Sequence, residues 1–337
     1  MNRKTVLYLC LLFLFISTES LVYAAPEAVN FSHISINSGL SQSTVFSIAQ
    51  DKSGNMWFAT YDGINKYDGY SFTVYRHEST APNSIANDIA KVIKMDSKGT
   101  MWIGTRDGLS CYDEQKDVFK NFSYEVNGNK VQVNAIEEMQ PGLLMIGTDN
   151  GLTMFDTNQM RFLKDKLRSN VKSLIPVCLV KSNEYIYIGT GEGLFQYHIA
   201  KQELSPLTQA LKGKKIQSVL KQSGSRLWVA TEGDGLYLIN PITKAVANYR
   251  HETGNSKSIS SNYIRSLALD TQNRLWIGTF NDLNIYKEAS DSFDKYSYDP
   301  MNVGSLSQNS IRSIFLDAQG GMWLGTYFGG LNYYHPL

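Results

Sequence analysis

Short apolar segments separated by polar turns recur along most of the chain. The first four segments that belong together are residues 45–50, 56–60, 64–67 and 72–75. Their shortness, their aromatic and β-branched side chains and the Gly and Asp residues between them are typical of β-strands joined by tight turns. Because helix signals are nearly absent, the pattern predicts an all-β fold.

One motif marks every repeat of this pattern: a large residue, usually aromatic, then an aliphatic residue, Gly or Ala, and Thr. Its seven copies begin at Trp57, Trp102, Met145, Tyr187, Trp228, Trp276 and Trp323. Successive copies are 41–48 residues apart, which is the length of a four-stranded β-propeller blade. All five tryptophans of the chain start a copy. We expect them to fill the wedge between neighbouring sheets, with the Gly or Ala leaving room for the next blade.

The two ends of the repeat array predict a closed ring. The seventh repeat ends after its third strand, and residues 31–36 precede the first repeat as an isolated fourth strand. If this strand completes blade seven, no sheet edge is left exposed. The sequence therefore predicts one seven-bladed propeller of four-stranded antiparallel blades at residues 31–337, preceded by a short linker at 25–30.

The first 24 residues have the pattern of a secretory signal peptide. Arg3 and Lys4 precede an apolar run at 6–16 that is too short to span a bilayer, and Val22-Tyr23-Ala24 is a small-x-small cleavage site. We expect cleavage after Ala24, no direct membrane span in the mature chain, and a periplasmic or secreted location.

Charge and cysteine content exclude several classes of protein. Lys and Arg number 32 against 31 Asp and Glu, so no strong basic field favours nucleic acid as a partner. Cys111 and Cys178 fall in different blades, which favours two free thiols over a disulfide. No spacing typical of a metal site, glycine-rich phosphate loop or nucleophile elbow is present, so neither a metal nor a cofactor is expected.

The repeats resemble those of the two-component regulator propeller family. The resemblance rests on Ser305-Leu-Ser-x-Asn-x-Ile-x-Ser-Ile-x-x-Asp317, on Gly-x-x-Trp-Ile-Gly-Thr-x-x-Gly-Leu and on Phe-x-x-Tyr. It covers essentially the whole mature chain, although the repeats at Met145 and Tyr187 are degenerate. These repeats are best known from the periplasmic sensor regions of hybrid two-component histidine kinases of gut Bacteroidetes.

The resemblance implies a sensor for glycan fragments without a kinase core of its own, and so a truncated or fragmentary member of such a regulator. It would be attached to the inner membrane if the gene continues beyond this chain. Its partners would be an oligosaccharide, the remaining sensor-kinase modules or another periplasmic protein. The segment from His77 to Pro82 matches a phospho-accepting histidine box, but it follows a strand and precedes a turn, so we interpret the match as accidental.

A candidate ligand site lies where the second strand of each blade turns into the third. In a four-stranded blade this turn and the connection to the next blade share one face, around the mouth of the central channel. The residue after each motif Thr gives a ring of seven: Tyr61, Arg106, Asp149, Gly191, Glu232, Phe280 and Tyr327. The long connections 76–87, 250–262 and 298–309 lie on the same face. Aromatic rings there can stack on sugars, and Arg106 can bind a carboxylate or sulfate; packing between blades or contact with a partner protein are the alternatives.

Enzymatic interpretations find weaker support in the sequence. The turns that begin at Asp51, Asp96 and Asp317 resemble the Asp-box of sialidases with one residue too many, and their aspartates are expected to close hairpins instead. A propeller lyase or glycosidase could use Glu192, Glu232 or Asp149. The sequence favours a non-catalytic sensor, with a protein-interaction platform as the second hypothesis.

Overall fold

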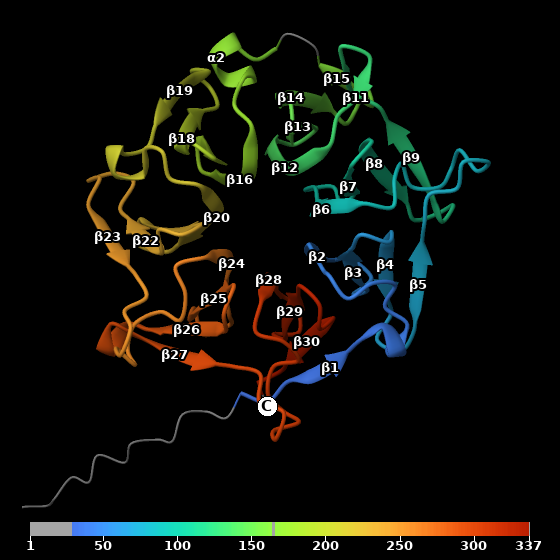
Figure 1. Ribbon diagram of the computed structural model, residues 1–337. Helices are drawn as coiled ribbons and strands as arrows, with labels where there is room; N and C mark the ends of the chain where they lie inside the picture. Colours follow the sequence, from blue (N-terminus) through green and yellow to red (C-terminus); the bar gives the residue numbers. More distant parts are fainter. Residues whose placement is uncertain (1–28, 164–165, 337) are drawn as a thin grey trace, which may run out of the picture. The chain divides into compact units, whose positions relative to one another are not determined.

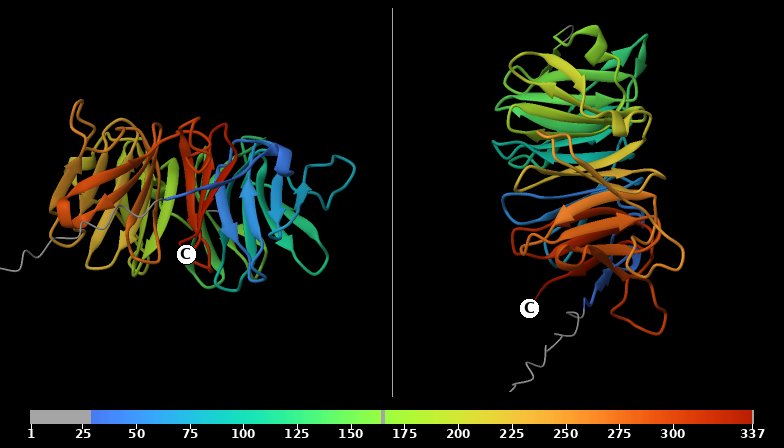
Figure 2. Two further views of the ribbon diagram at one scale, coloured as in Figure 1. Left: turned by 90° about the horizontal axis from the view of Figure 1, so that it is seen from below. Right: turned by 90° about the vertical axis from the view of Figure 1, so that its left-hand side faces the viewer.

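Seven antiparallel sheets of four strands each surround a common axis (Figure 1). The computed structural model describes residues 29–163 and 166–336, and the sheets belong to the unit Phe31–Leu337. Seen from the side, this unit is a flat disc whose strands run from one face to the other (Figure 2). The predicted all-β, seven-bladed propeller is confirmed. The predicted signal peptide, residues 1–24, lies outside the described residues.

The first strand of each blade lies nearest the axis and the fourth lies at the rim (Figure 1). Blades one to three are β2 (Ser47–Gln50), β3 (Met56–Ala59), β4 (Ile64–Tyr67), β5 (Phe72–Tyr75); β6 (Ala90–Met95), β7 (Met101–Thr105), β8 (Gly108–Asp113), β9 (Val118–Phe122); and β12 (Val133–Gln140), β13 (Leu143–Thr148), β14 (Gly151–Asp156), β15 (Arg161–Leu163). Blades four and five are β16 (Pro176–Ser182), β17 (Tyr185–Thr190), β18 (Gly193–His198), β19 (Glu203–Pro206); and β20 (Ile216–Gln222), β21 (Arg226–Thr231), β22 (Leu236–Ile239), β23 (Val246–Tyr249). Blades six and seven are β24 (Ile264–Leu269), β25 (Leu275–Thr279), β26 (Leu283–Lys287), β27 (Ser292–Tyr296); and β28 (Ile311–Leu316), β29 (Met322–Thr326), β30 (Leu331–Tyr334), β1 (Ser32–Ile34).

Short elements lie between the blades. A two-stranded hairpin of β10 (Glu125–Val126) and β11 (Asn129–Lys130) follows blade two, and helix α2 (Ser169–Lys172) follows blade three. Three short 3-10 helices also lie in the described residues: η2 (Ile36–Ser38), η3 (Gln209–Leu211) and η4 (Glu288–Ser290).

The N-terminal strand closes the ring, as the sequence predicts. β1 pairs antiparallel with β30, with Ser32 opposite Tyr333 and Ile34 opposite Leu331, and the blue start of the ring lies beside its red end (Figure 1). The strand is shorter than the predicted 31–36. It ends because the Ser35 side chain accepts a hydrogen bond from the Asn37 N–H and caps η2.

The motif positions hold the blades together. The tryptophans that start five copies are at most 6% exposed, and Met145 and Tyr187 fill the same position in the two degenerate blades. The Gly two residues later leaves no room for a side chain: a Cβ on Gly104 would lie 2.6 Å from Val133 of the next blade, and one on Gly278 would lie 2.7 Å from Ile311. The predicted close approach of neighbouring blades is therefore confirmed.

The two predicted free thiols are confirmed. Cys111 lies in β8 and Cys178 in β16, and neither forms a disulfide. Burial raises the pKa of the Cys111 thiol to about 11 and that of Cys178 to about 12. Both thiols therefore stay protonated near neutral pH and are poor nucleophiles.

Candidate functional site

The turn between the second and third strands of each blade is shaped by the motif Thr. In blade one, Thr60 Oγ1 donates to the Gly63 carbonyl at 3.0 Å and accepts from the Asp62 N–H at 3.0 Å. Gly63 itself has φ +85°, where any Cβ would clash with the Tyr75 carbonyl. The turn therefore presents the residue after Thr60, Tyr61, to solvent, and Tyr61 is 41% exposed.

These turns meet the connections between blades on one face. The Gly63 N–H donates to the Asp88 carbonyl at 2.7 Å, and the Gly233 and Gly235 N–H groups both donate to the Asn262 carbonyl, at 3.0 and 3.1 Å. Asp88 and Asn262 end the long connections that lead into blades two and six. The arrangement expected from the sequence, with both kinds of loop on one face, is therefore present.

Three of the candidate residues, Tyr61, Phe280 and Tyr327, contact side chains of the innermost strands at the inner end of this face. The Tyr61 ring packs edge-on against Phe46, with 4.5 Å between the ring centroids. The guanidinium carbon of Arg265 lies 5.3 Å from the ring centroid of Phe280 and 5.5 Å from that of Tyr327. Aromatic side chains of blades one, six and seven thus surround neighbouring positions near the axis.

The other candidates are placed differently. Glu232 accepts a hydrogen bond from Gln217 Nε2 at 2.9 Å, and its charge acts on Arg265. Asp149 accepts from the Gln132 N–H at 3.1 Å, and Arg106 is exposed with its backbone N–H bonded to Ile89. Among the described residues, Arg106 and Asp149 form no contact with the aromatic residues of the site. Gly191 is exposed and has open space around it.

A second ring of residues lies directly below these turns, on the innermost strands. In blades two to seven the pairing between the first and second strands shifts register one residue after the strand begins. An extra residue of this kind, a β-bulge, redirects its side chain. The bulge residues, with the matching Phe46 of blade one, are Phe46, Lys91, Asn134, Val177, Gln217, Arg265 and Arg312.

Bulge residues of adjacent blades contact one another. Lys91 Nζ lies 3.9 Å from the ring centroid of Phe46 and 4.6 Å from that of Tyr61. Arg312 also contacts Phe46, with its guanidinium carbon 4.6 Å from the ring centroid. Three cations and one aromatic residue therefore form a continuous arc over blades six, seven, one and two. We call Lys91, Arg265 and Arg312 the cation arc.

The cation arc is electrostatically strained. Burial and the neighbouring Arg312 lower the pKa of Lys91 to about 8. Burial lowers the pKa of Arg312, and Arg265 lowers it further; burial also lowers the pKa of Arg265, partly offset by Tyr327 and Glu232. Nη1 of Arg265 and Nε of Arg312 are buried without a hydrogen-bond partner in the described part of the chain. None of the three cations forms an ion pair with a carboxylate of residues 29–163 or 166–336.

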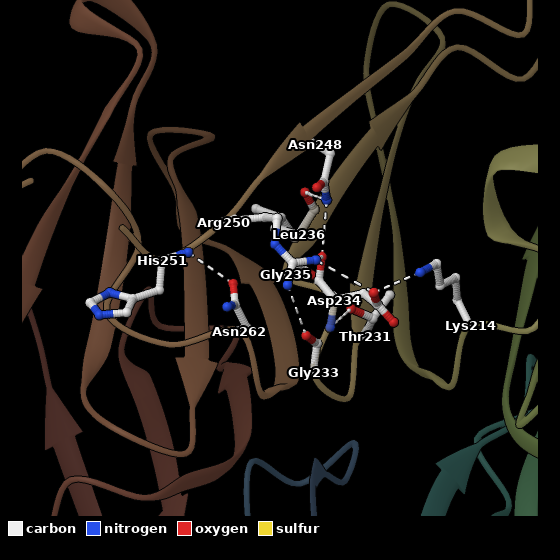
Figure 3. Close-up of polar contacts among 10 residues, drawn as sticks. All are labelled: Lys214, Thr231, Gly233, Asp234, Gly235, Leu236, Asn248, Arg250, His251 and Asn262. Atoms are coloured by element: carbon white, nitrogen blue, oxygen red, sulfur yellow. Dashed lines mark hydrogen bonds and ion pairs between the residues drawn. The ribbon is translucent and has the colours of Figure 1, made fainter. Parts of the chain in front are cut away.

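Charges on the outer part of the same face are paired instead. Asp234 lies in the turn of blade five between Lys214, whose Nζ is 2.7 Å from Oδ1, and Arg250, whose Nη1 is 3.4 Å away (Figure 3). The network continues to the Gly233 carbonyl and to Asn248 (Figure 3). In blade one the Arg76 guanidinium likewise binds Asp62 through two hydrogen bonds of 2.9 Å.

The histidines of the long connections have structural partners. His77 Nδ1 lies 2.8 Å from the Ile85 carbonyl, and His251 Nδ1 lies 2.9 Å from the Ile259 carbonyl. The His251 N–H donates to Asn262 (Figure 3). The residues from His77 to Pro82 contain no helix, so they lack the context of a phospho-accepting histidine.

The described residues contain neither a cluster of metal-binding side chains nor a membrane-spanning helix. No group of three or more His, Cys, Asp or Glu side chains within 29–163 and 166–336 could hold a metal ion. No helix in the same residues is long and apolar enough to cross a membrane.

The cation arc was missed in the sequence although a signal was present. Ile264-Arg265-Ser266 and Ile311-Arg312-Ser313 are the same tripeptide pattern, 47 residues apart, in blades six and seven. Both arginines stand 11 residues before the tryptophan of their blade, Trp276 and Trp323, so the motif alignment itself already places them in one ring. The register shift that turns them inward leaves no trace in the hydrophobic pattern.

Comparisons with known proteins support the repeat assignment. The family model for the two component regulator propeller matches residues 39–62, 258–281 and 305–328. These segments run from the end of one connection through the motif Thr in blades one, six and seven. A segment of 48 residues is 50% identical to histidine kinase P4 of Formosa agariphila and covers 14% of this chain and 4% of that kinase.

Solved structures share the fold. The extracellular domain described as part of a hybrid two component system of B. thetaiotaomicron superposes with a TM-score of 0.76 at 25% identity, over 91% of this chain and 42% of that one. A second extracellular domain of B. thetaiotaomicron, described as part of a one component system, gives a TM-score of 0.74 at 23% identity, over 91% and 40%. Streptogramin B lyase gives 0.67 at 12% identity, over 91% and 97%, which is a likeness of fold alone.

The chain thus spans less than half the length of the two extracellular domains and a small fraction of the kinase. The match of the family model, the shared blade architecture and the motif residues agree with one another. The protein is a seven-bladed propeller in which blades one, six and seven match the two component regulator propeller repeat.

Proposed function

We propose that this propeller is a periplasmic ligand-sensing domain of a two-component regulator, and that its ligand is a glycan fragment. The observation that carries the proposal is the gathering of aromatic rings around the inner end of one face, on repeats of a regulator family: Tyr61 and Phe280 are exposed and Tyr327 is half-buried. Tyr61, Phe280 and Tyr327 come from three consecutive blades and offer flat apolar surfaces that suit the faces of sugar rings.

Signalling would require further modules. The repeats are similar to those of proteins described as hybrid two component systems, and this chain spans 42% of one such extracellular domain. We propose that ligand binding changes how the propeller packs against the remaining sensor and kinase modules, or against another periplasmic protein. In this proposal the propeller itself has no kinase activity.

Calorimetric titration with a panel of neutral and acidic oligosaccharides tests the glycan proposal. Binding should shift the melting temperature, since a ligand at a hundredfold excess over its Kd stabilises the folded state by about 2.7 kcal/mol. Tyr61→Ala and Phe280→Ala should each weaken binding. Tyr70→Ala is the matched control, because Tyr70 is 95% exposed in the turn between β4 and β5, on the opposite face. Equal affinities for all three variants and the wild type would contradict the site.

A protein-interaction platform is the second candidate function. Its support is the connection between blades six and seven, where Met301 and Val303 are 91% and 92% exposed beside the 51% exposed Tyr298. Exposed apolar side chains grouped in one loop are typical of contact surfaces. If no oligosaccharide of the panel binds, and Met301→Asp with Val303→Asp abolishes association with a second sensor module, this function replaces the first.

A further inference from the structure

No carboxylate in the described part of the chain forms an ion pair with the cation arc. Lys91, Arg265 and Arg312 come from three separate blades, and in each the bulge directs the side chain to the same inner level. Blades three, four and five carry Asn134, Val177 and Gln217 at this level, so the fold itself accepts neutral residues there. A purely structural need for cations at the bulge is therefore absent.

Holding three cations together in this way destabilises the free protein. Like charges repel, and partial burial removes the water that would screen them. The rings of Phe46, Phe280 and Tyr327 compensate in part, since the face of an aromatic ring attracts a cation. They supply no hydrogen-bond acceptor for the buried nitrogens of Arg265 and Arg312.

Elsewhere on the same face, cations form ion pairs with carboxylates. Asp234 binds Lys214 and Arg250, and Asp62 binds Arg76. Among the carboxylates of the described residues, Glu232 acts on Arg265 of the arc, and it is already bonded to Gln217. A group that supplied negative charge between blades six, seven and two would offset the repulsion among the three cations.

We infer that the ligand of this face is an acidic oligosaccharide, whose carboxylate or sulfate groups bind Lys91, Arg265 and Arg312 while its sugar rings lie against Tyr61, Phe280 and Tyr327. Guanidinium groups match the paired oxygens of carboxylates and sulfates, and Lys91 adds a point charge. The near-neutral chain gives little long-range attraction for polyanions, so recognition depends on local contacts at the arc. This inference rests on the proposed glycan-sensing function and specifies its substrate class.

The test uses three probes matched in length: an oligogalacturonate, a sulfated chondroitin oligosaccharide and a neutral xylo-oligosaccharide, with inorganic sulfate alone as a fourth. We expect at least one acidic probe to bind and the neutral probe to bind at least tenfold more weakly. Arg312→Gln and Arg265→Gln should each weaken acidic binding by about ten- to hundredfold, because each removes a charge-assisted hydrogen bond. Whether galacturonate or chondroitin sulfate binds more tightly distinguishes carboxylate from sulfate as the preferred group.

Lys214→Gln is the control, since it removes a cation of the same face that is already paired with Asp234. It should leave the affinity unchanged. Thermal unfolding without ligand separates a binding role from a structural one: Arg312→Gln should melt at the wild-type temperature or above, because it relieves repulsion. A lower melting temperature together with unchanged affinity would overturn the inference.

The remaining outcomes separate this inference from the proposed function. Tight binding of the neutral probe, unaffected by Arg312→Gln, overturns the acidic ligand and leaves glycan sensing intact. Binding of inorganic sulfate that depends on Arg312, with no response to any oligosaccharide, supports the arc as an anion site and overturns the glycan. No response to any of the four probes overturns both.

Discussion

The indole nitrogen of Trp102 donates a hydrogen bond to Asp96, with 2.9 Å between Nε1 and Oδ2. Oδ1 of the same carboxylate accepts from the backbone N–H groups of Lys98 and Thr100 at 3.0 and 2.8 Å. One side chain thus closes the hairpin between β6 and β7 and anchors the tryptophan that packs against the next blade. The equivalent pairs are Asp51–Trp57, Asp270–Trp276 and Asp317–Trp323, with Gln222–Trp228 in blade five.

Replacing Asp96 by Ala should lower the stability of the propeller more than replacing a turn aspartate that binds no tryptophan. The change leaves the buried indole N–H without an acceptor and removes two turn hydrogen bonds, which together should lower the free energy of unfolding by about 2–4 kcal/mol. Denaturant unfolding followed by tryptophan fluorescence measures this loss.

Asp156→Ala is the control for this prediction. Asp156 closes the turn after β14 through the N–H groups of Asn158 and Gln159, at 2.8 and 2.9 Å, and binds no tryptophan. It should cost about 1 kcal/mol. Equal losses for the two variants would show that the bond to Trp102 contributes nothing.

The Gly of the tryptophan motif should tolerate no side chain. In Gly104→Ala the new Cβ would lie 2.6 Å from methyl groups of Val92 and Val133 and 2.8 Å from the Val133 carbonyl. Backbone on the neighbouring blade would have to move, so we expect a loss of about 1–3 kcal/mol. Gly191→Ala provides the contrast, because that position is exposed with open space around it and should stay within about 0.5 kcal/mol of wild type. Thermal unfolding of both variants compares them, and similar melting temperatures would refute the close approach.

The fold was predictable because each blade solves the same packing problem. A tryptophan, a small residue and a Thr are needed at fixed positions in every blade, so the repeat spacing and the orphan strand at 31–36 determined the blade number and the closure. The hairpin role of the aspartates followed from ordinary turn chemistry and is confirmed by Asp51 and Asp96. Their bonds to Trp57 and Trp102 were missed, although the same six-residue spacing recurs in four blades, because the motif was interpreted as a turn signal alone.

Only part of the candidate site could be predicted from the sequence in this way. Counting from the motif Thr located Tyr61, Phe280 and Tyr327 at the turns on one face. The cation arc depends on β-bulges, which are set by how the first two strands pair and not by alternation along either strand. A residue such as Arg312, between Ile311 and Ser313, reads as an ordinary strand position until the pairing is known.

Because β1 closes the ring, we expect the melting temperature and the oligomeric state to depend strongly on this strand. Deleting residues 25–35 would remove β1 and leave the outer edge of β30 unpaired over Leu331–Tyr333. Unpaired edges favour association with other chains, so we expect a melting temperature lower by about 5–15 °C and oligomers in size-exclusion chromatography with light scattering. Deleting only residues 25–30 retains β1, although it removes the buried Val29, and should lower the melting temperature much less and leave the protein monomeric. A monomeric 25–35 deletion with wild-type stability would contradict closure by β1.

The lowered pKa of Lys91 predicts a pH dependence of stability with a definite sign. The pKa is about 8 in the folded protein against an ordinary value of 10.5. Below pH 8 the side chain is charged in both states, so its full burial cost weakens the fold. Between pH 8 and 10.5 the unfolded state binds more protons at this site, and the free energy of unfolding rises with pH. The groups facing Lys91 are Arg312 from β28, with Phe46 and Tyr61 from blade one.

Comparison of wild type with Lys91→Met isolates this effect, because all other lysines and tyrosines titrate in both proteins. The variant should be the more stable protein at pH 7, and its advantage should shrink steadily as the pH is raised to 10. Lys214→Met should behave differently, since the hydrogen bond to Asp234 raises the pKa of Lys214 and its contribution to stability persists below 10.5. Denaturant unfolding at pH 7, 8, 9 and 10 measures all three proteins. If the difference in free energy of unfolding between wild type and Lys91→Met stays constant over this range, Lys91 is as well solvated as a surface lysine. The electrostatic strain assigned to the cation arc would then come from the two arginines alone.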